Sequence, residues 1–206
     1  NLLRAVLPAA VALTLLALAM LILFTPAWVH LALSLSGGDA WLGSASVARH
    51  LSDRTISELL WGPATFAFAG PDGRPFYTAN EAAHMRDVRV VLFAFLGVAL
   101  AATALVSWRL ARGADRSAAW RAIARGGAGL AIGLAVAGAI AAVAFGPAFE
   151  LFHRILFPGG NWAFPADSNL VRLYPLGFWQ LSTAAMGGLG IGAGALTWLV
   201  ARRRAR

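Results

Sequence analysis

Residues 109–149 read RLARGADRSAAWRAIARGGAGLAIGLAVAGAIAAVAFGPAF. Five arginines and one aspartate occupy the first part, residues 109–125, whereas the 24 residues that follow, 126–149, contain no charged side chain. An apolar helix of about 20 residues is long enough to cross the hydrocarbon core of a bilayer. Arginines concentrate in the loops that flank a span on its cytoplasmic side. This stretch therefore predicts a membrane span preceded by a cytoplasmic loop.

The composition of the whole chain agrees with a membrane protein. Of its 206 residues, 59% are hydrophobic and 13% are charged. A soluble chain of this length could not bury so much apolar surface, which excludes a soluble enzyme and a disordered chain. The net charge of +8 comes from arginines that cluster between apolar runs, so we interpret it as a topology signal rather than a nucleic-acid surface. The absence of cysteine excludes disulfides and cysteine-dependent chemistry.

Three more apolar runs are long enough to span a membrane, so the expected fold is an all-α membrane protein with four transmembrane helices. The expected spans are residues 1–35, 88–111, 126–149 and 176–201. They are connected by outer segments 36–87 and 150–175 and by a cytoplasmic loop at 112–125, and the chain ends in an arginine-rich cytoplasmic tail at 202–206. The arginine distribution, which includes Arg4, places both termini in the cytoplasm.

The two outer segments are expected to form a small α/β cap on the extracytoplasmic side. Residues 65–68 alternate in polarity and residues 75–78 could return as a second strand after the turn-forming sequence Gly-Pro-Asp-Gly at 70–73. Residues 46–60 have the pattern of a short amphipathic helix. Thr78 and Glu81 have the spacing of a capping box at the start of a helix that continues into the second span.

Two of the four histidines share a position relative to the membrane. His84 precedes the apolar run of the second span by four residues, and His153 follows that of the third span by four residues. Both are therefore expected at the outer surface, about 6 Å beyond the hydrocarbon edge at roughly 1.5 Å per residue. Two titratable groups at matched depth on different helices make a candidate site. Two independent interfacial histidines, each bonded to a neighbour, explain the pattern equally well.

Each of these histidines follows a glutamate by three residues, in Glu81-x-x-His84 and Glu150-x-x-His153. A Glu-x-x-His motif on each of two helices is typical of di-metal bundles, but that site needs two further glutamates and the chain has only Glu58. A single zinc ion held by two histidines and a carboxylate stays a minor alternative. We favour the capping role for Glu81 and leave the role of Glu150 open.

Three segments resemble the lipoprotein intramolecular transacylase family. Residues 152–164, FHRILFPGGNWAF, resemble its FHxxxFxxxxW signature, and residues 170–179, LVRLYPLGFW, resemble the LxxLxPxxFF sequence that follows. Residues 81–89, EAAHMRDVR, resemble its HMxDV segment, with Arg89 where lysine is expected. The four spans and two outer segments fit as well, so the resemblance covers nearly the whole chain.

The resemblance implies an enzyme that acts on bacterial lipoproteins with an S-diacylglyceryl cysteine at the N-terminus. The sn-2 acyl chain would move to the α-amino group of the same cysteine and leave a lyso-form, N-acyl S-monoacylglyceryl lipoprotein. The family is associated with two histidines, which would be His84 and His153. The main requirements of such a transfer are a near-attack geometry, a general base and a hydrogen-bond donor to the oxyanion of the tetrahedral intermediate. We expect His153 to be the base and His84 the donor, with the reverse order and a covalent acyl-enzyme left open.

Other polar and aromatic residues of the outer segments are candidates for binding the lipid or the cysteine backbone, although packing explains them equally well. They are Asp87, Asn161, Trp162, Arg172 and Tyr174. We expect no metal and no cofactor. The expected partners are the diacylated lipoprotein substrate and membrane lipids, with no nucleic acid and a monomeric state. The expected location is the bacterial cytoplasmic membrane, with the active site on its outer side.

Two other functions are compatible with the sequence. His84 and His153 could be axial ligands of a haem in a b-type electron-transfer protein with four helices. Alternatively, the protein could be a membrane scaffold that binds lipidated partners without catalysis. A Soret absorption band would favour the first alternative, and full activity after replacement of both histidines would favour the second.

Overall fold

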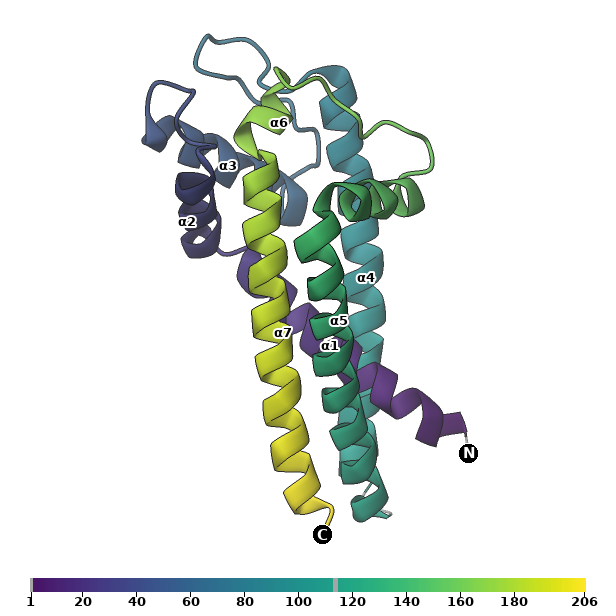
Figure 1. Cartoon of the computed structure of the whole chain (residues 1–206). Coiled ribbons are helices and arrows are strands. Elements are labelled where there is room, and N and C mark those ends of the chain that lie inside the picture. The colour runs from purple at the N-terminus through teal and green to yellow at the C-terminus, as the bar shows by residue number, and fades with distance from the viewer. Residues whose placement is uncertain (1, 113–114) are drawn as a thin grey trace. The chain divides into compact units, whose positions relative to one another are not determined.

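The structure is a computed structural model that describes residues 2–112 and 115–206, with side chains from residue 5 onward. The side chain of Arg4 and residues 113–114 of the expected 112–125 loop lie outside the described part. The described chain is mostly helical (Figure 1). Its helices are α1 (Leu2–Leu23), α2 (Pro26–Ser36), α3 (Ala45–Leu60), α4 (Ala79–Ala111), α5 (Arg116–Leu156), α6 (Asn169–Leu173) and α7 (Leu176–Arg204).

Four helices are long and apolar enough to cross a membrane, as the sequence predicts. They are Ala5–Leu23 within α1, Ala79–Ala111, Arg116–Leu156 and Leu176–Arg204. Large apolar side chains are exposed along them; Ile132, Val143 and Leu100, for example, are 66%, 87% and 71% exposed. An apolar surface of this kind requires lipid around it. The protein is therefore an integral membrane protein.

The first apolar run, expected as one span over residues 1–35, is two helices. Proline disfavours helical geometry in the residue before it, so a helix ends ahead of Thr25 and Pro26. Thr25 instead caps α2: its backbone is extended, and its side chain accepts a hydrogen bond from the Trp28 backbone N–H. The candidate span is accordingly Ala5–Leu23.

The expected loop at 112–125 is helical from Arg116 onward, because α5 runs from Arg116 to Leu156. This helix is interrupted at Ala144, where φ is −140° and ψ is 44°. Pro147 lies three residues later; it has no N–H to donate, and its ring would clash with the carbonyl of Val143 in a regular helix. The kink therefore has a local cause in the sequence.

The α/β cap predicted from the sequence is wrong, since the cap segments are helices and irregular loops. In the described residues this region has one isolated antiparallel bridge, between Ala69 and Pro75. Its two backbone hydrogen bonds run from the Gly70 N–H to the Arg74 carbonyl and from the Phe76 N–H to the Phe68 carbonyl. Phe66 has a positive φ of 53°, which is incompatible with an extended strand. The Glu58 carboxylate accepts hydrogen bonds from the N–H groups of Thr65 and Phe66 and holds this loop in place.

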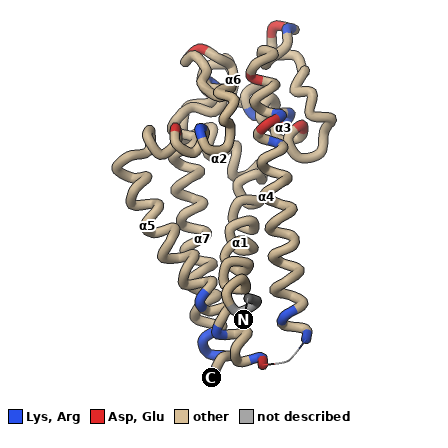
Figure 2. The backbone as a smooth tube through the Cα atoms, turned by 90° about the vertical axis from the view of Figure 1, so that its right-hand side faces the viewer, with Lys and Arg blue, Asp and Glu red and all other residues tan. Residues whose placement is uncertain are grey.

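The chain divides into two compact units, which we call the helix unit and the site unit. The helix unit consists of Asn1–Ile22, Ala94–Val143 and Ala184–Arg206, and the site unit of Leu23–Phe93 and Ala144–Thr183. In the helix unit, arginines gather at the ends of α4, α5 and α7 (Figure 2). In the site unit, α3 and α6 are joined by a buried hydrogen bond between the hydroxyls of Ser52 and Tyr174, 2.9 Å apart.

Glycines allow α5 and α7 to approach closely in the helix unit. A Cβ atom built on Gly127 would lie 2.6 Å from the Gly194 carbonyl oxygen, and one on Gly194 would lie 2.6 Å from that of Gly127. The sequence has small-residue spacings at Gly129/Gly133, Gly188/Gly192 and Gly190/Gly194, which predict helix packing. Gly194 makes such a contact, whereas a Cβ atom built on Gly129 or Gly133 would meet nothing within 4 Å. In α5 the contact therefore uses Gly127 instead.

We expect the Gly127→Ala variant to be less stable than the parent protein by about 1–3 kcal/mol, because the added methyl group forces the helices apart. The control is Gly133→Ala on the same helix, where nothing lies within 4 Å. That change should be neutral or stabilise the protein by up to about 1 kcal/mol through helix propensity. The measurement is the thermal unfolding midpoint of both variants in the same detergent. Equal midpoints for the two variants would contradict the close contact.

Candidate active site

The structure brings His84 and His153 together within the site unit. His84 lies in the second turn of α4, and His153 lies in the last turn of α5. Their ring centroids are 6.1 Å apart, with an angle of 30° between the ring planes. The two imidazoles are thus close enough to contact one small reacting group.

The hydrogen bond of His153 determines which of its nitrogens can act as a base. Its Nδ1 lies 2.8 Å from the backbone carbonyl oxygen of Phe149, one turn earlier in α5. A carbonyl can only accept, so Nδ1 holds the proton, and in the neutral ring Nε2 keeps its lone pair. The ring lies among aromatic side chains, with its centroid 4.2 Å from that of Phe149 and 5.2 Å from that of Trp162.

His84 is the more buried of the pair, with 6% of its surface exposed. Its ring makes edge contacts with Phe157 and Phe164, at centroid distances of 4.8 and 5.6 Å. Its Nδ1 is buried and has no hydrogen-bond partner in the described residues. Apolar surroundings disfavour a charged imidazolium, so the environment of His84 favours the neutral ring.

The loop after α5 builds the aromatic enclosure of both histidines. The Phe157 N–H donates to the His153 carbonyl, and the Gly160 N–H donates to the Phe157 carbonyl. Gly160 has a φ of 74°, a left-handed geometry that other residues adopt at a cost. The chain reverses at this turn, and the following residues Trp162 and Phe164 contact His153 and His84, respectively.

Two of the expected binding residues are bonded to each other beside the histidines. The Asn161 side-chain amide donates to Asp87 Oδ2 over 2.6 Å. Asp87 lies three residues after His84 on α4, whereas Asn161 belongs to the loop that contains Trp162. The bond therefore ties this loop to α4. Asp87 forms no described hydrogen bond with either imidazole.

The two glutamates of the Glu-x-x-His motifs have different partners. Glu81 is buried and completes the predicted capping box: its Oε2 accepts from the N–H and the hydroxyl of Thr78, and its Oε1 accepts from the Leu170 N–H at the start of α6. Glu150 is exposed and pairs with Arg154 through a 2.5 Å contact. Neither glutamate bonds to a histidine. Among the described residues, no group of three or more potential ligands lies where it could hold a metal ion.

The two remaining expected residues contact other parts of the site unit. The Arg172 guanidinium lies over the Trp41 ring, 3.8 Å from its centroid. Tyr174 bonds to Ser52, and burial raises the pKa of its phenol to about 12. Burial also raises the pKa of Tyr77 well above its usual value. Both phenols therefore stay protonated at neutral pH and cannot act as bases.

Phe157 and Arg89 also build the candidate site, although they were not among the site residues predicted from the sequence. Phe157 follows His153 by four residues, which places both on one helical face, and it contacts both imidazole rings. That spacing was a usable signal. Arg89 donates through Nη1 to the carbonyls of Glu58 and Gly62, and this anchors the end of α3 to α4. No short-range pattern predicts this contact, because its partners lie about 30 residues away.

These features define a class: a polytopic helical membrane protein whose candidate site is a pair of imidazoles among aromatic side chains. The family profile described as "Lipoprotein intramolecular transacylase Lit" matches residues 46–179, more than half of the chain. The chain therefore belongs to the Lit family of lipoprotein intramolecular transacylases, which are acyltransferases. The resemblance drawn from the three sequence segments is confirmed.

Solved structures of Lit from Bacillus cereus share the fold. One has a TM-score of 0.80 at 17% identity and covers 98% of this chain and 94% of that one. Variants of the same protein with a histidine changed to arginine or to alanine have TM-scores of 0.75 and 0.68. At 17% identity this likeness establishes the fold alone.

A curated relative matches over a short stretch. An uncharacterised protein of Aquifex aeolicus (strain VF5) is 44% identical over 36 residues, which are 18% of this chain and 17% of that protein. The match spans less than a fifth of the relative's length, so the relative adds nothing on activity.

Proposed function

We propose that the protein transfers an acyl chain within a diacylated bacterial lipoprotein, from the sn-2 ester oxygen to the α-amino group of the lipidated cysteine. Family membership supports the reaction class. The observation on which the mechanism rests is the pair of imidazoles with centroids 6.1 Å apart. The substrate would be the lipoprotein N-terminus, and its product a lyso-form lipoprotein with an N-acyl group.

His153 is suited to be the general base. An α-ammonium group has a pKa of about 7.7–8.0, so it first loses one proton to solvent, and the neutral amine is the form that attacks the ester. The Nδ1–H of His153 is bonded to the Phe149 carbonyl, which leaves the Nε2 lone pair to accept the second proton that the nitrogen loses as it attacks. The aromatic side chains of Phe149 and Trp162 pack against the ring and would hold its orientation.

His84 is suited to donate a hydrogen bond to the oxyanion. Its Nδ1 is buried without a partner. Buried N–H groups without an acceptor are rarer in proteins than buried acceptors without a donor, which favours the tautomer with the proton on Nε2. His84 would then present an N–H where His153 presents a lone pair. A donor that is already in place stabilises the developing negative charge without reorganisation.

In the proposed reaction, His153 removes a proton from the amine as the nitrogen attacks the ester carbonyl carbon. The N–C bond forms, and His84 donates to the resulting oxyanion. The bond between that carbon and the sn-2 oxygen then breaks, and the imidazolium of His153 returns its proton to this oxygen. No atom enters or leaves, so product and substrate are isomers. Because nucleophile and ester share one molecule, the main catalytic task is to hold a near-attack geometry.

The other expected site residues would bind the substrate or support the site, according to the contacts they make. Trp162 and the Asp87–Asn161 pair lie beside the histidines and would contact the cysteine backbone or glycerol. Arg172 and Tyr174 would support the edge of the site indirectly. Arg172 packs on Trp41, and Tyr174 is bonded to Ser52 of α3. The protein would act as a monomer among the lipids of the bacterial cytoplasmic membrane, where the arginine distribution favours cytoplasmic termini and an extracytoplasmic active site.

The proposed topology predicts the labelling of single cysteines. The chain has no cysteine, so Arg116→Cys and Ser46→Cys each create one reactive thiol. We expect a membrane-impermeant maleimide to label residue 46 in intact cells and residue 116 only after lysis. Labelling of residue 116 in intact cells would reverse the orientation and place the histidines on the cytoplasmic side.

We expect the enzyme to keep its activity after treatment with a chelator. The carboxylates of the two Glu-x-x-His motifs are engaged elsewhere, since Glu81 caps α4 and Glu150 pairs with Arg154. Asp87 accepts a hydrogen bond from Asn161. Aminolysis of an ester by a positioned amine needs a base and an oxyanion donor, which the two imidazoles can supply. The measurement is lipopeptide turnover together with metal analysis of the purified protein. Stoichiometric zinc, with activity lost on its removal and restored on its return, would overturn this expectation.

The function itself is tested by tandem mass spectrometry of a lipoprotein N-terminus from cells with and without this protein. We expect the N-acyl, S-monoacylglyceryl form only in cells that contain it. Identical lipoprotein N-termini in both strains would contradict the proposed function, and a Soret band in the purified protein would favour the haem alternative.

A further inference from the structure

Helix α2 lies outside the four candidate membrane spans, yet one of its faces is apolar and exposed. Leu31 and Leu35, about one helical turn apart, are 50% and 64% exposed, and Ala27 extends the row by another turn. We call these three residues the α2 ridge. The opposite face, with Val29 and Leu33, is buried. Exposed apolar side chains are common singly, but contiguous ones indicate a contact surface.

The polarity of the ridge differs from that of α3, the neighbouring helix of the site unit. The α2 sequence, PAWVHLALSLS, contains no Asp, Glu, Lys or Arg, and its one titratable side chain, His30, is bonded to Asp53 of α3 at 2.8 Å. The exposed positions of α3 are all polar: Ser46, Arg49, His50, Asp53, Arg54 and Ser57. The surface of α3 is therefore suited to water, whereas the α2 ridge is suited to lipid.

The contacts of α2 place it beside the first turns of α7 (Figure 1). The Trp28 indole N–H donates to the Ser182 hydroxyl over 3.3 Å. Near the end of α2, Ser36 lies against Gly177, where an added Cβ atom would be 3.4 Å from the Ser36 Cβ. α2 therefore runs antiparallel to α7, between the levels of residues 182 and 177.

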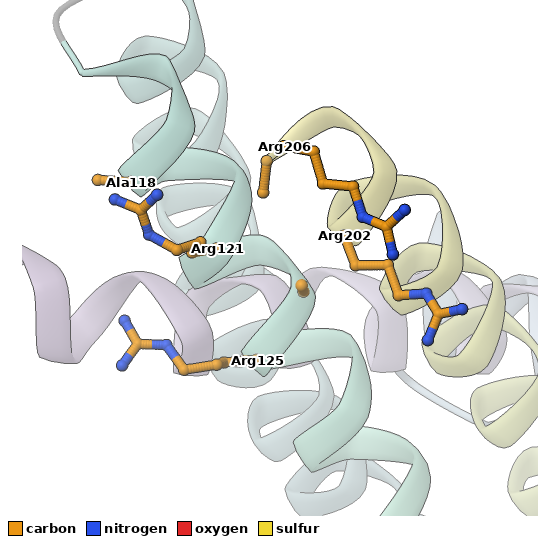
Figure 3. A pocket seen from close by; sticks show the side chains of 7 residues that line it. Ala118, Arg121, Arg125, Arg202 and Arg206 are labelled. Atoms are coloured by element: carbon orange, nitrogen blue, oxygen red, sulfur yellow. The ribbon is translucent and has the colours of Figure 1, made fainter.

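The length of α7 indicates the depth of α2 in the membrane. Its uncharged part ends at Arg202, whose side chain extends away from Arg121 and Arg125 of α5 (Figure 3). A hydrocarbon core about 30 Å thick takes about 20 helical residues, which places its other edge near Ser182. The headgroup layer beyond that edge is about 5–8 Å thick, and the helix rises about 7.5 Å between Ser182 and Gly177. α2 therefore lies at the level of the lipid headgroups.

We propose that the α2 ridge contacts the lipids of the membrane, so that α2 is an interfacial helix in addition to the four spans. Such a helix buries its apolar face about 5–10 Å into the boundary between headgroups and acyl chains. The ridge is continuous with the lipid-facing surface of the spans, because α2 begins at Pro26, directly after the candidate span that ends at Leu23. Since α2 is bonded to α3 and α7, this contact holds the site unit at the level of the headgroups.

The proposal is tested by fluorescence quenching of single labelled cysteines, since the chain has no cysteine of its own. The Leu31→Cys and Leu35→Cys variants of the full chain are each labelled with bimane and placed in phosphatidylcholine nanodiscs, where both membrane faces meet the solution. The quenchers are a phosphatidylcholine with a nitroxide near the top of one acyl chain, and iodide in the water. We expect the nitroxide lipid to quench both labels about twofold or more, because the ridge lies at the depth of the nitroxide, and iodide to quench them weakly.

The matched control is Ser57→Cys, which places the same label on an exposed position of α3. Iodide should quench this label strongly, whereas the nitroxide lipid should leave it nearly unchanged. Because two ridge positions are measured, a folding defect in one variant does not decide the result. Equal quenching of the ridge and α3 labels by either quencher would overturn the lipid contact. Protection of the ridge labels from both quenchers would show that protein, such as a second copy of the chain, covers the ridge, and would overturn lipid as its partner.

Discussion

The His153→Ala variant is expected to lose about 10²–10⁴-fold in the rate of acyl transfer, the range contributed by a positioned general base. The physical reason is the tautomer that the Phe149 carbonyl enforces, which leaves Nε2 free to accept the amine proton. His153→Gln should be equally impaired, because an amide keeps a hydrogen bond but cannot accept and return a proton near neutral pH. The measurement is single-turnover transfer on a synthetic diacylated lipopeptide.

The matched control for this variant is His50→Gln, which changes an exposed histidine of α3. It should retain the parent rate. Thermal unfolding of each variant separates a catalytic loss from a folding defect. Near-normal transfer by His153→Gln at normal protein levels would remove the role of base from His153.

The second large effect is expected at His84, with a different dependence on the substituted residue. His84→Ala should lose about 10²–10³-fold, as when an oxyanion donor is removed. His84→Gln should retain more activity than His153→Gln, since an amide N–H can still donate to an oxyanion. If His84→Gln is the worse of the two, the roles of base and donor are reversed.

Replacement of both histidines should cost little more than replacement of one. Residues that act on the same tetrahedral intermediate have strongly non-additive effects. The His84→Ala/His153→Ala variant therefore tests whether the two imidazoles serve one step. Full activity in this double variant would favour a non-catalytic scaffold, and losses that simply multiply would indicate separate steps.

The membrane spans were predictable from the sequence because lipid imposes a local requirement: each span must be long, apolar and internally hydrogen-bonded. The capping box at Thr78 and Glu81 was predictable for a similar reason, since its spacing of three residues is fixed by helix geometry. The break at Pro26 and the kink near Pro147 have equally local causes. Both prolines are in the sequence and could have been used to predict the break and the kink.

The cap was mispredicted because its conformation depends on residues distant in the sequence. Alternation at 65–68 favours a strand, but Glu58 binds the N–H groups of Thr65 and Phe66 and stabilises a turn with positive φ angles. This tertiary contact overrides the local β-propensity. Of the Gly127–Gly194 contact, the small-residue spacing indicated Gly194 but not Gly127, because the many glycines of α5 give no local signal of which ones face a neighbour.

For the candidate site, the proximity of His84 and His153 was expected from their matched distances to the apolar runs, and their ring centroids are 6.1 Å apart. The contact of Arg172 with Trp41 and that of Tyr174 with Ser52 were not predicted. Arg172 and Tyr174 are polar or aromatic and lie in the matching family segment, so the sequence alone could not separate support of the fold from contact with substrate.

Whether the acyl shift is intramolecular is tested most directly by an isotope crossover measurement with the purified protein. Two diacylated lipopeptides are mixed, one with a deuterated sn-2 acyl chain and the other with a labelled peptide, and the products are sequenced by tandem mass spectrometry. We predict that each intact mass is unchanged and that each acyl chain is found on the amine of its own peptide, with no transfer after His153→Ala. Deuterated acyl chains on the labelled peptide, or amines that stay free in the presence of the active protein, would contradict the account.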